Sequence, residues 1–168
     1  MKLTLVLTFA LAISACNRSE EISSIDPINW EKKAMNYSLP DSLETGETYL
    51  SVYSQIYSIT EHRTHDLTVT VSMRNIHRTD SVYLLKAEYF DTHGVLVRTY
   101  FDQPIFLAPL ETVEIVIDGI DQAGGTGGNF LFDWKIKPGS PEPFFEAIMI
   151  STMGQQGLSF STQGRKVE

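Results

Sequence analysis

Hydrophobic and polar residues alternate along most of the chain from Glu47 onward. The clearest stretch runs from Leu67 to Arg74, where every second residue is large and apolar and the others are threonine, serine or arginine. A period of two puts the apolar side chains on one face of an extended segment, so this stretch predicts a half-buried strand. The pattern recurs in seven further segments: 48–59, 82–90, 95–101, 107–119, 130–136, 144–152 and 158–167. In the segment 82–90 the alternation assigns four residues to one face: Tyr83, Leu85, Ala87 and Tyr89.

These eight segments are separated by short polar turns, and no helical period follows residue 47. The tetrapeptide Asp91–Gly94 suits a tight turn, with aspartate opening it and glycine taking a positive φ. Strands at such spacing are typical of an antiparallel sandwich or barrel. The order of strands and corners favours an all-β fold, an immunoglobulin-like β-sandwich of about eight strands.

The amino terminus has the layout of a bacterial secretory signal. Lys2 precedes an apolar run from Leu3 to Ile13, and small residues lead to Cys16, the one cysteine of the chain. The run is too short for a stable membrane-spanning helix. The segment ending at Cys16 resembles a lipobox, which implies a diacylglyceryl-modified cysteine that anchors the protein. The alternative is an ordinary signal cleaved nearby, with the cysteine there by chance.

The expected organisation has three parts. Residues 1–15 form the lipoprotein signal peptide, residues 16–46 the lipidated cysteine and a flexible tether, and residues 47–168 the β-sandwich domain. Trp30 is the notable residue of the tether and is expected to tuck against the domain. Asn17 resembles the residue that follows the cysteine in outer-membrane lipoproteins. The acidic Arg18–Glu21 segment resembles a surface-export signal or is a solvated tether.

Charge and cysteine content exclude several classes of protein. The formal net charge is −8, which would repel nucleic acid phosphates. One cysteine permits neither an intramolecular disulfide nor a CxxC metal knuckle. No cofactor is expected and no metal site, since His62 and His65 lie in an expected turn without a third converging ligand.

The segment Ala123–Trp134 contains four closely spaced glycines, which raises the question of phosphate binding. A phosphate-binding loop would need a following lysine and helix, whereas here a strand-like aromatic segment follows. The glycines therefore predict a crossing between two strands, where glycine permits positive φ and close backbone approach. A nest of backbone N–H groups that binds a small anion stays open as an alternative.

Five motifs occur in order between residues 49 and 166: SMRN, YFDTHG, GGTGGNF, EAIMIST and QGLSFSTQGR. Together they resemble the bacterial family catalogued as domain of unknown function 3124. The resemblance implies a secreted or lipid-anchored envelope protein. It implies no established activity and therefore no catalytic residues.

The polar and glycine residues inside these motifs are the candidates for a ligand site or for turn structure. They are Arg74, Asn75, Asp91, Asp121, Gly124, Gly125, Gly127, Gly128, Asn129 and Arg165. As structural residues, the asparagines and Asp91 would cap turns, and Asp121 or Asp133 could pair with Arg74 or Arg165. As functional residues, they would form an anion or peptide site beside the glycine loop.

The expected function is a non-catalytic binding or accessory module anchored in the bacterial envelope, most simply at the outer membrane. Its partners would be the membrane, through the lipid, and an envelope protein or small ligand. The alternative is a small envelope hydrolase that uses Ser159 or a histidine such as His65 together with a carboxylate. Ser159 lies in a sequence that misses the G-x-S-x-G pattern.

Overall fold

The fold was analysed in a computed structural model that describes residues 30–152 and 157–168. The predicted signal peptide, Cys16 and residues 17–29 lie outside the described residues. A short 3-10 helix η2 (Trp30–Lys32) precedes the strands. The strands are β1 (Glu44–Val52), β2 (Gln55–Ser58), β3 (Thr60–Asp66), β4 (Thr68–Arg74), β5 (Val82–Phe90), β6 (Leu96–Phe101), β7 (Ile105–Leu107), β8 (Thr112–Ile117), β9 (Gly128–Ile136), β10 (Phe144–Ser151), β11 (Leu158–Gln163) and β12 (Arg165–Lys166).

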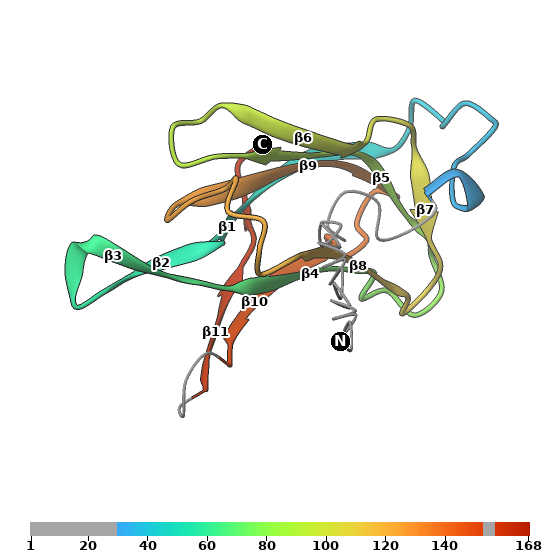
Figure 1. The fold of residues 1–168 in the computed structure, drawn as a ribbon. Coiled ribbons are helices and arrows are strands. Elements are labelled where there is room, and N and C mark those ends of the chain that lie inside the picture. The colour runs from blue at the N-terminus through green and yellow to red at the C-terminus, as the bar shows by residue number, and fades with distance from the viewer. Residues whose placement is uncertain (1–29, 153–156) are drawn as a thin grey trace, which may run out of the picture.

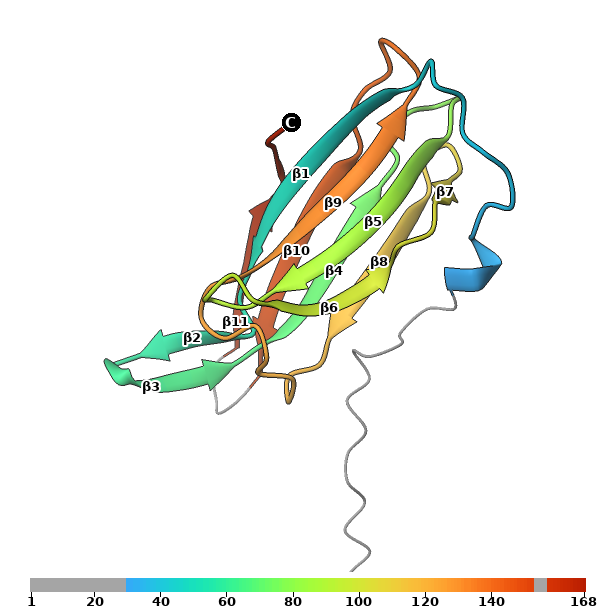
Figure 2. The ribbon, with the colours of Figure 1, turned by 90° about the horizontal axis from the view of Figure 1, so that it is seen from above.

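Two antiparallel sheets pack face to face, as Figures 1 and 2 show. The first has the order β12-β1-β9-β5-β6, with β7 also paired to β5, and the second has the order β11-β10-β4-β8. Strands β2 and β3 form a separate hairpin that projects from one end of the sandwich. The predicted β-sandwich is confirmed. The larger number of strands comes from short elements that sequence periodicity merged or missed.

Strands β4, β5, β8 and β9 carry the immunoglobulin-like connection. Strands β4 and β8 are neighbours in one sheet, β5 and β9 are neighbours in the other, and the chain crosses between sheets from β4 to β5 and from β8 to β9. The first strand differs from the constant-type immunoglobulin arrangement. Here β1 pairs with β9 in the first sheet, and β10 lies beside β4.

The core fills the space between the sheets with residues that alternate along the strands. Strand β4 buries Val69, Val71 and Met73, as its period of two predicts. Phe132 of the first sheet stacks on Phe145 of the second, with ring centroids 4.4 Å apart. These contacts join the two sheets through large apolar side chains, whose burial is the main stabilising contribution.

The expected facing of β5 is wrong over its first half. Tyr83 and Leu85 are only partly buried, whereas the buried residues there are Val82 and Leu84. The pairing of β5 with β9 shifts register between Leu84 and Lys86, which marks a β-bulge. A bulge adds one residue to a strand, so the alternation reverses on passing it.

Part of the predicted tether packs on the sandwich. Trp30 lies in the expected tucked position, with its ring centroid 4.9 Å from that of Phe101. Ala34 forms a β-bridge with Ile105, and residues up to 43 then lead to β1, which begins at Glu44. The chain thus reaches the domain at its β6–β7 edge.

Candidate functional site

One end of the sandwich collects most of the candidate residues. We call it the loop end, and it comprises the β5–β6 turn (91–95), the β8–β9 loop (118–127) and the β2–β3 hairpin (55–66). Strand pairing brings these segments together, because Phe90 pairs with Asn129 and Val52 pairs with Gly128.

The β8–β9 loop is fixed at its start by a buried ion pair. Both terminal nitrogens of Arg98 donate to Oδ2 of Asp121 at 3.2 Å, and Arg98 also donates to the Tyr100 hydroxyl at 2.9 Å. The side chain of Asp121 is only 4% exposed. Arg74 and Arg165, the expected partners of Asp121, are therefore wrong. Its partner is Arg98, which the sequence did not single out. Because Asp121 neutralises Arg98, this guanidinium is not a free anion site.

The glycines of the loop allow close packing on Tyr89. An ideal Cβ at Gly124 would lie 2.6 Å from Cζ of Tyr89 and closer still to its hydroxyl oxygen. Gly125 takes a φ of 66°, and its carbonyl accepts hydrogen bonds from Gln55 N at 3.0 Å and Ser54 Oγ at 3.2 Å. The loop is therefore the predicted strand crossing, with positive φ at Gly125 and close approach at Gly124.

Thr92 ties the β5–β6 turn to the same loop. Its hydroxyl donates to the Gly124 carbonyl at 3.0 Å and accepts from the Gly127 N–H at 3.0 Å. Asp91 organises its own turn by accepting from His93 N and Val95 N, each at 2.8 Å. The hydrogen bond from Val95 is the main reason that the pKa of Asp91 is lowered. The loop end is therefore held in one arrangement by polar contacts between segments distant in sequence.

Tyr89 is the buried titratable group beneath this loop. Its hydroxyl is fully buried and has no hydrogen-bond partner within bonding geometry among the described residues. Burial raises its pKa to about 12, and the Ser54 side chain acts in the opposite direction.

The remaining candidates are scattered. Asn129 and Gly128 begin strand β9 and occupy ladder positions in the sheet. Arg165 lies on β12, opposite Tyr49. Arg74 ends β4 away from the loop end, where it bonds Thr112 at 3.3 Å and lies 3.8 Å from Glu146. The fold therefore keeps Gly128 and Asn129 beside the glycine loop but places Arg74 and Arg165 away from it, so the candidates do not form a single cluster.

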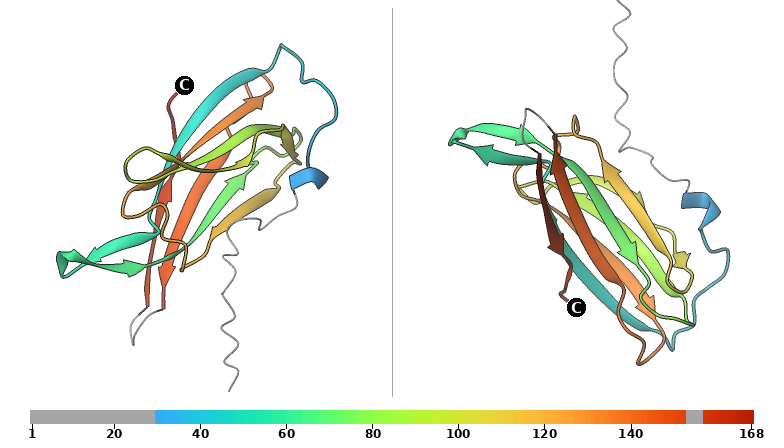
Figure 3. Two further views of the ribbon diagram at one scale, coloured as in Figure 1. Left: turned by 45° about the horizontal axis from the view of Figure 1, so that its top comes forward. Right: turned by 90° about the horizontal axis from the view of Figure 1, so that it is seen from below.

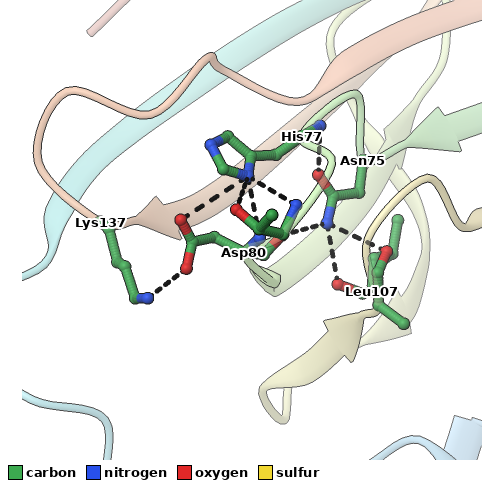
Figure 4. Close-up of polar contacts among 7 residues, drawn as sticks. Asn75, His77, Asp80, Leu107 and Lys137 are labelled. Carbon is green, nitrogen blue, oxygen red and sulfur yellow. Dashed lines mark hydrogen bonds and ion pairs between the residues drawn. The ribbon is translucent and has the colours of Figure 1, made fainter.

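Asn75 organises the opposite end of the sandwich, as Figure 4 shows. Its amide nitrogen lies 2.8 Å from the carbonyl oxygen of Asp80, 3.1 Å from that of Leu107 and 3.0 Å from that of Ala108. His77 Nδ1 accepts from the N–H groups of Thr79 and Asp80 at 3.1 and 2.8 Å, which fixes this nitrogen as the unprotonated one. Lys137 forms an ion pair with Asp80. The side chains of Asn75, His77, Asp80 and Lys137 all bond within the chain, so the cluster structures the β4–β5 loop.

Exposed apolar side chains are prominent at the loop end. At the hairpin tip Ile59 is 90% exposed with a φ of 67°, and Tyr57 is 60% exposed. A positive φ is uncommon for a β-branched residue. At the foot of the hairpin a cleft of about 300 Å³ is lined by Ile120, Ile150 and Asp66 among others. Val95 and Leu96 add exposed apolar surface at the β5–β6 turn.

The residues of the hydrolase alternative lie on separate strands. Ser159 is on β11, paired with Ile150, and His65 is on β3, paired with Ile56. No hydrogen bond joins them in the described part of the chain. The expected turn at His62 and His65 is wrong, because both belong to strand β3. Within residues 30–152 and 157–168, no group of three or more His, Cys, Asp or Glu side chains is placed to hold a metal ion.

The comparison with protein families follows the motifs of the sequence. Residues 45–167 match the family described as "Protein of unknown function (DUF3124)". The chain belongs to this family. The resemblance drawn from the five motifs is thereby confirmed, and two of these motifs, Tyr89–Gly94 and Gly124–Phe130, meet at the loop end of the DUF3124 domain. No curated protein and no solved structure matches the chain. None of the described helices is long and apolar enough to cross a membrane.

Proposed function

We propose that this protein is a lipid-anchored module of the bacterial envelope that binds an envelope partner through its loop end. One observation carries the binding role. Exposed apolar residues, foremost Tyr57 and Ile59, project from an end of the sandwich whose loops are fixed by buried and bridging polar contacts. Exposed large apolar side chains at one end of a domain are typical of an interaction site, and fixed loops at that end lose little conformational entropy on binding.

The chain geometry supports the same proposal. The segment from Trp30 to residue 43 packs along the β6–β7 edge and continues to the end of the sandwich where β1 starts. The loop end therefore carries none of this segment. In a module tethered through Cys16, the loop end would stay accessible to a second molecule.

Anchoring is tested by replacing Cys16 with serine in the producing bacterium. We expect metabolic labelling with a palmitate analogue to disappear and the protein to leave the membrane fraction. A variant that stays with membranes while carrying no lipid would contradict the anchor. Protein release with a retained domain fold, judged by resistance to proteolysis, would separate loss of anchoring from misfolding.

Partner binding is tested by photo-crosslinking in intact cells from two matched positions. A photoreactive amino acid at Ile59 is compared with the same residue at Ile76, which is 49% exposed at the opposite end of the sandwich. We expect a discrete crosslinked adduct from position 59 and none from position 76. Equal adducts from both positions, or adducts from 76 alone, would refute binding at the loop end.

A further inference from the structure

Strand β8 forms a regular open edge of the second sheet. It pairs with β4 over all of its residues, from Thr112 opposite Arg74 to Ile117 opposite Val69, without a register shift. Its other side has no strand partner in the described part of the chain, and Figure 3 shows it as the outermost strand. In an antiparallel strand alternate residues turn their N–H and C=O groups to one side, so β8 directs a row of such groups outward.

The other edges of the two sheets are protected by different means. Strand β7 has only three residues, and the bridge from Ala34 to Ile105 covers it. Strand β6 pairs with β5 irregularly, with register shifts at Ala87 and Tyr89. Strand β12 covers β1, and β11 is joined to β1 of the first sheet, where the Thr162 hydroxyl donates to the Ser51 carbonyl at 2.6 Å. Short strands, bulges and covering segments are the devices by which proteins block edge pairing, and β8 lacks them.

The side chains of β8 also do not block pairing with another strand. Val113, Ile115 and Ile117 point into the core. The residues on the solvent face are threonine, glutamate and valine, so the strand contains no proline, glycine or lysine. Its composition has high β-propensity, and such an open edge is a template for pairing with another extended chain.

We propose that the β8 edge binds an extended segment of another polypeptide, which adds a strand to the second sheet and places a lysine or arginine opposite Glu114. Backbone hydrogen bonds supply the affinity, and alternate side chains supply the selectivity. Glu114 accepts a hydrogen bond from Ser72 at 3.1 Å but forms no ion pair with any described lysine or arginine. A basic side chain across from it is a favourable cross-strand pair.

Charge also argues against a second copy of this chain as the occupant. The formal net charge of −8 makes two copies repel each other. Antiparallel pairing of two β8 strands centred on Glu114 would bring the two carboxylates face to face, and like charges directly opposite each other destabilise a sheet. Pairing centred on Ile115 would instead place Glu114 opposite Val116, which gives the carboxylate no counter-charge. The segment that fits is therefore basic and belongs to a different protein. This inference does not depend on the proposed recognition role of the loop end.

The test uses the full mature chain and two synthetic peptides in which valine and threonine alternate with lysine or, in the second, with glutamate. We expect the lysine peptide to bind saturably in fluorescence anisotropy and to protect from hydrogen exchange those backbone amides of residues 112–117 that do not bond to β4. Glu114→Lys should weaken this peptide at least tenfold and strengthen the glutamate peptide. Glu61→Lys makes the same change in net charge at the hairpin and should leave both affinities within about twofold.

Three results would overturn the proposal. One is peptide binding without protection of the β8 amides, which would indicate adsorption by charge alone. The second is an equal loss of affinity in the two charge variants. The third is protection, in the peptide-free protein, of those β8 amides that do not bond to β4, with or without dimerisation in analytical ultracentrifugation, because the edge would then already be occupied.

Discussion

Gly124 is the position where the packing of the loop end can be tested most directly. A Cβ added there would lie 2.6 Å from Cζ and 3.1 Å from Cε2 of Tyr89. The Tyr89 ring cannot move aside easily, since it is fully buried and stacks on Phe130 with centroids 4.8 Å apart. Gly124→Ala must therefore shift either the loop backbone or a core ring.

The magnitude follows from two opposing contributions. Overpacking a filled site costs about 1–3 kcal/mol, and a contact this short belongs at the upper end of that range. Alanine lowers the entropy of the unfolded chain, which returns about 0.4–1 kcal/mol. We expect Gly124→Ala to lower the free energy of unfolding by about 2 kcal/mol, or roughly 8 °C in Tm for a domain of this size.

Gly127→Ala is the matched control in the same loop. A Cβ there would meet its nearest neighbour, Cγ2 of Thr92, at 3.4 Å, which is an ordinary van der Waals contact. Its Tm should stay equal to that of the parent or rise slightly. In a Tyr89→Phe background the closest clash at Gly124 is removed but the contact to Cζ remains, so the cost of Gly124→Ala should fall by only part of its value. Thermal melts followed by circular dichroism measure all four variants. Equal melting of the Gly124 and Gly127 variants would refute the packing argument.

Three further predictions concern titratable groups. Asp121→Asn should cost about 2–4 kcal/mol in denaturant unfolding, because it leaves Arg98 poorly compensated, whereas Glu142→Gln in an exposed pair should cost less than about 1 kcal/mol. The raised pKa of Tyr89, about 12, means that the folded state retains this proton where the unfolded state loses it. Stability should therefore fall as pH rises from 10 to 12, by ~2–3 kcal/mol from this group, and Tyr89→Phe should lack that fall while being nearly neutral at pH 7. Burial, followed by neighbouring carboxylates, raises the pKa of Glu47, so its protonation stabilises the fold as pH drops from neutral. Glu47→Gln should raise Tm at pH 7, with a gain that shrinks toward pH 4; a constant gain would argue for a cause other than charge.

Local alternation determined which strands could be predicted. Strand β4 follows its period of two and has the expected buried face. Strand β5 does not, because one inserted residue near Leu85 reverses the facing, and a count of apolar positions cannot register an insertion. Strand β3 is polar on both faces, so its sequence shows no period of two and predicts a turn instead.

The candidate site shows the same division between local and distant interactions. The turn formed by Asp91 follows from a tetrapeptide, and its hydrogen bonds join near neighbours. The partner of Asp121 is on β6, in a part of the sequence that carries no signal for this pairing. The contact between Gly124 and Tyr89 likewise depends on how the β8–β9 loop crosses the end of β5. Glycine spacing predicts that close approach occurs, but only the assembled sandwich identifies the approached side chain.

Because β12 pairs with β1, the last residues of the chain complete the sheet that the first strand begins. Lys166 lies opposite Thr48, and the backbone of Glu47 exchanges hydrogen bonds of 2.9 and 3.0 Å with Val167 and Glu168. During synthesis from the amino terminus, the outer edge of β1 must wait for nearly the entire domain before it is covered. Such a late, long-range closure slows folding and leaves an unpaired strand edge accessible in the meantime. A protein shortened by its last four residues would carry that open edge permanently. Pairing of β12 with β1 is therefore the step that ends the period in which the folding chain is prone to aggregate.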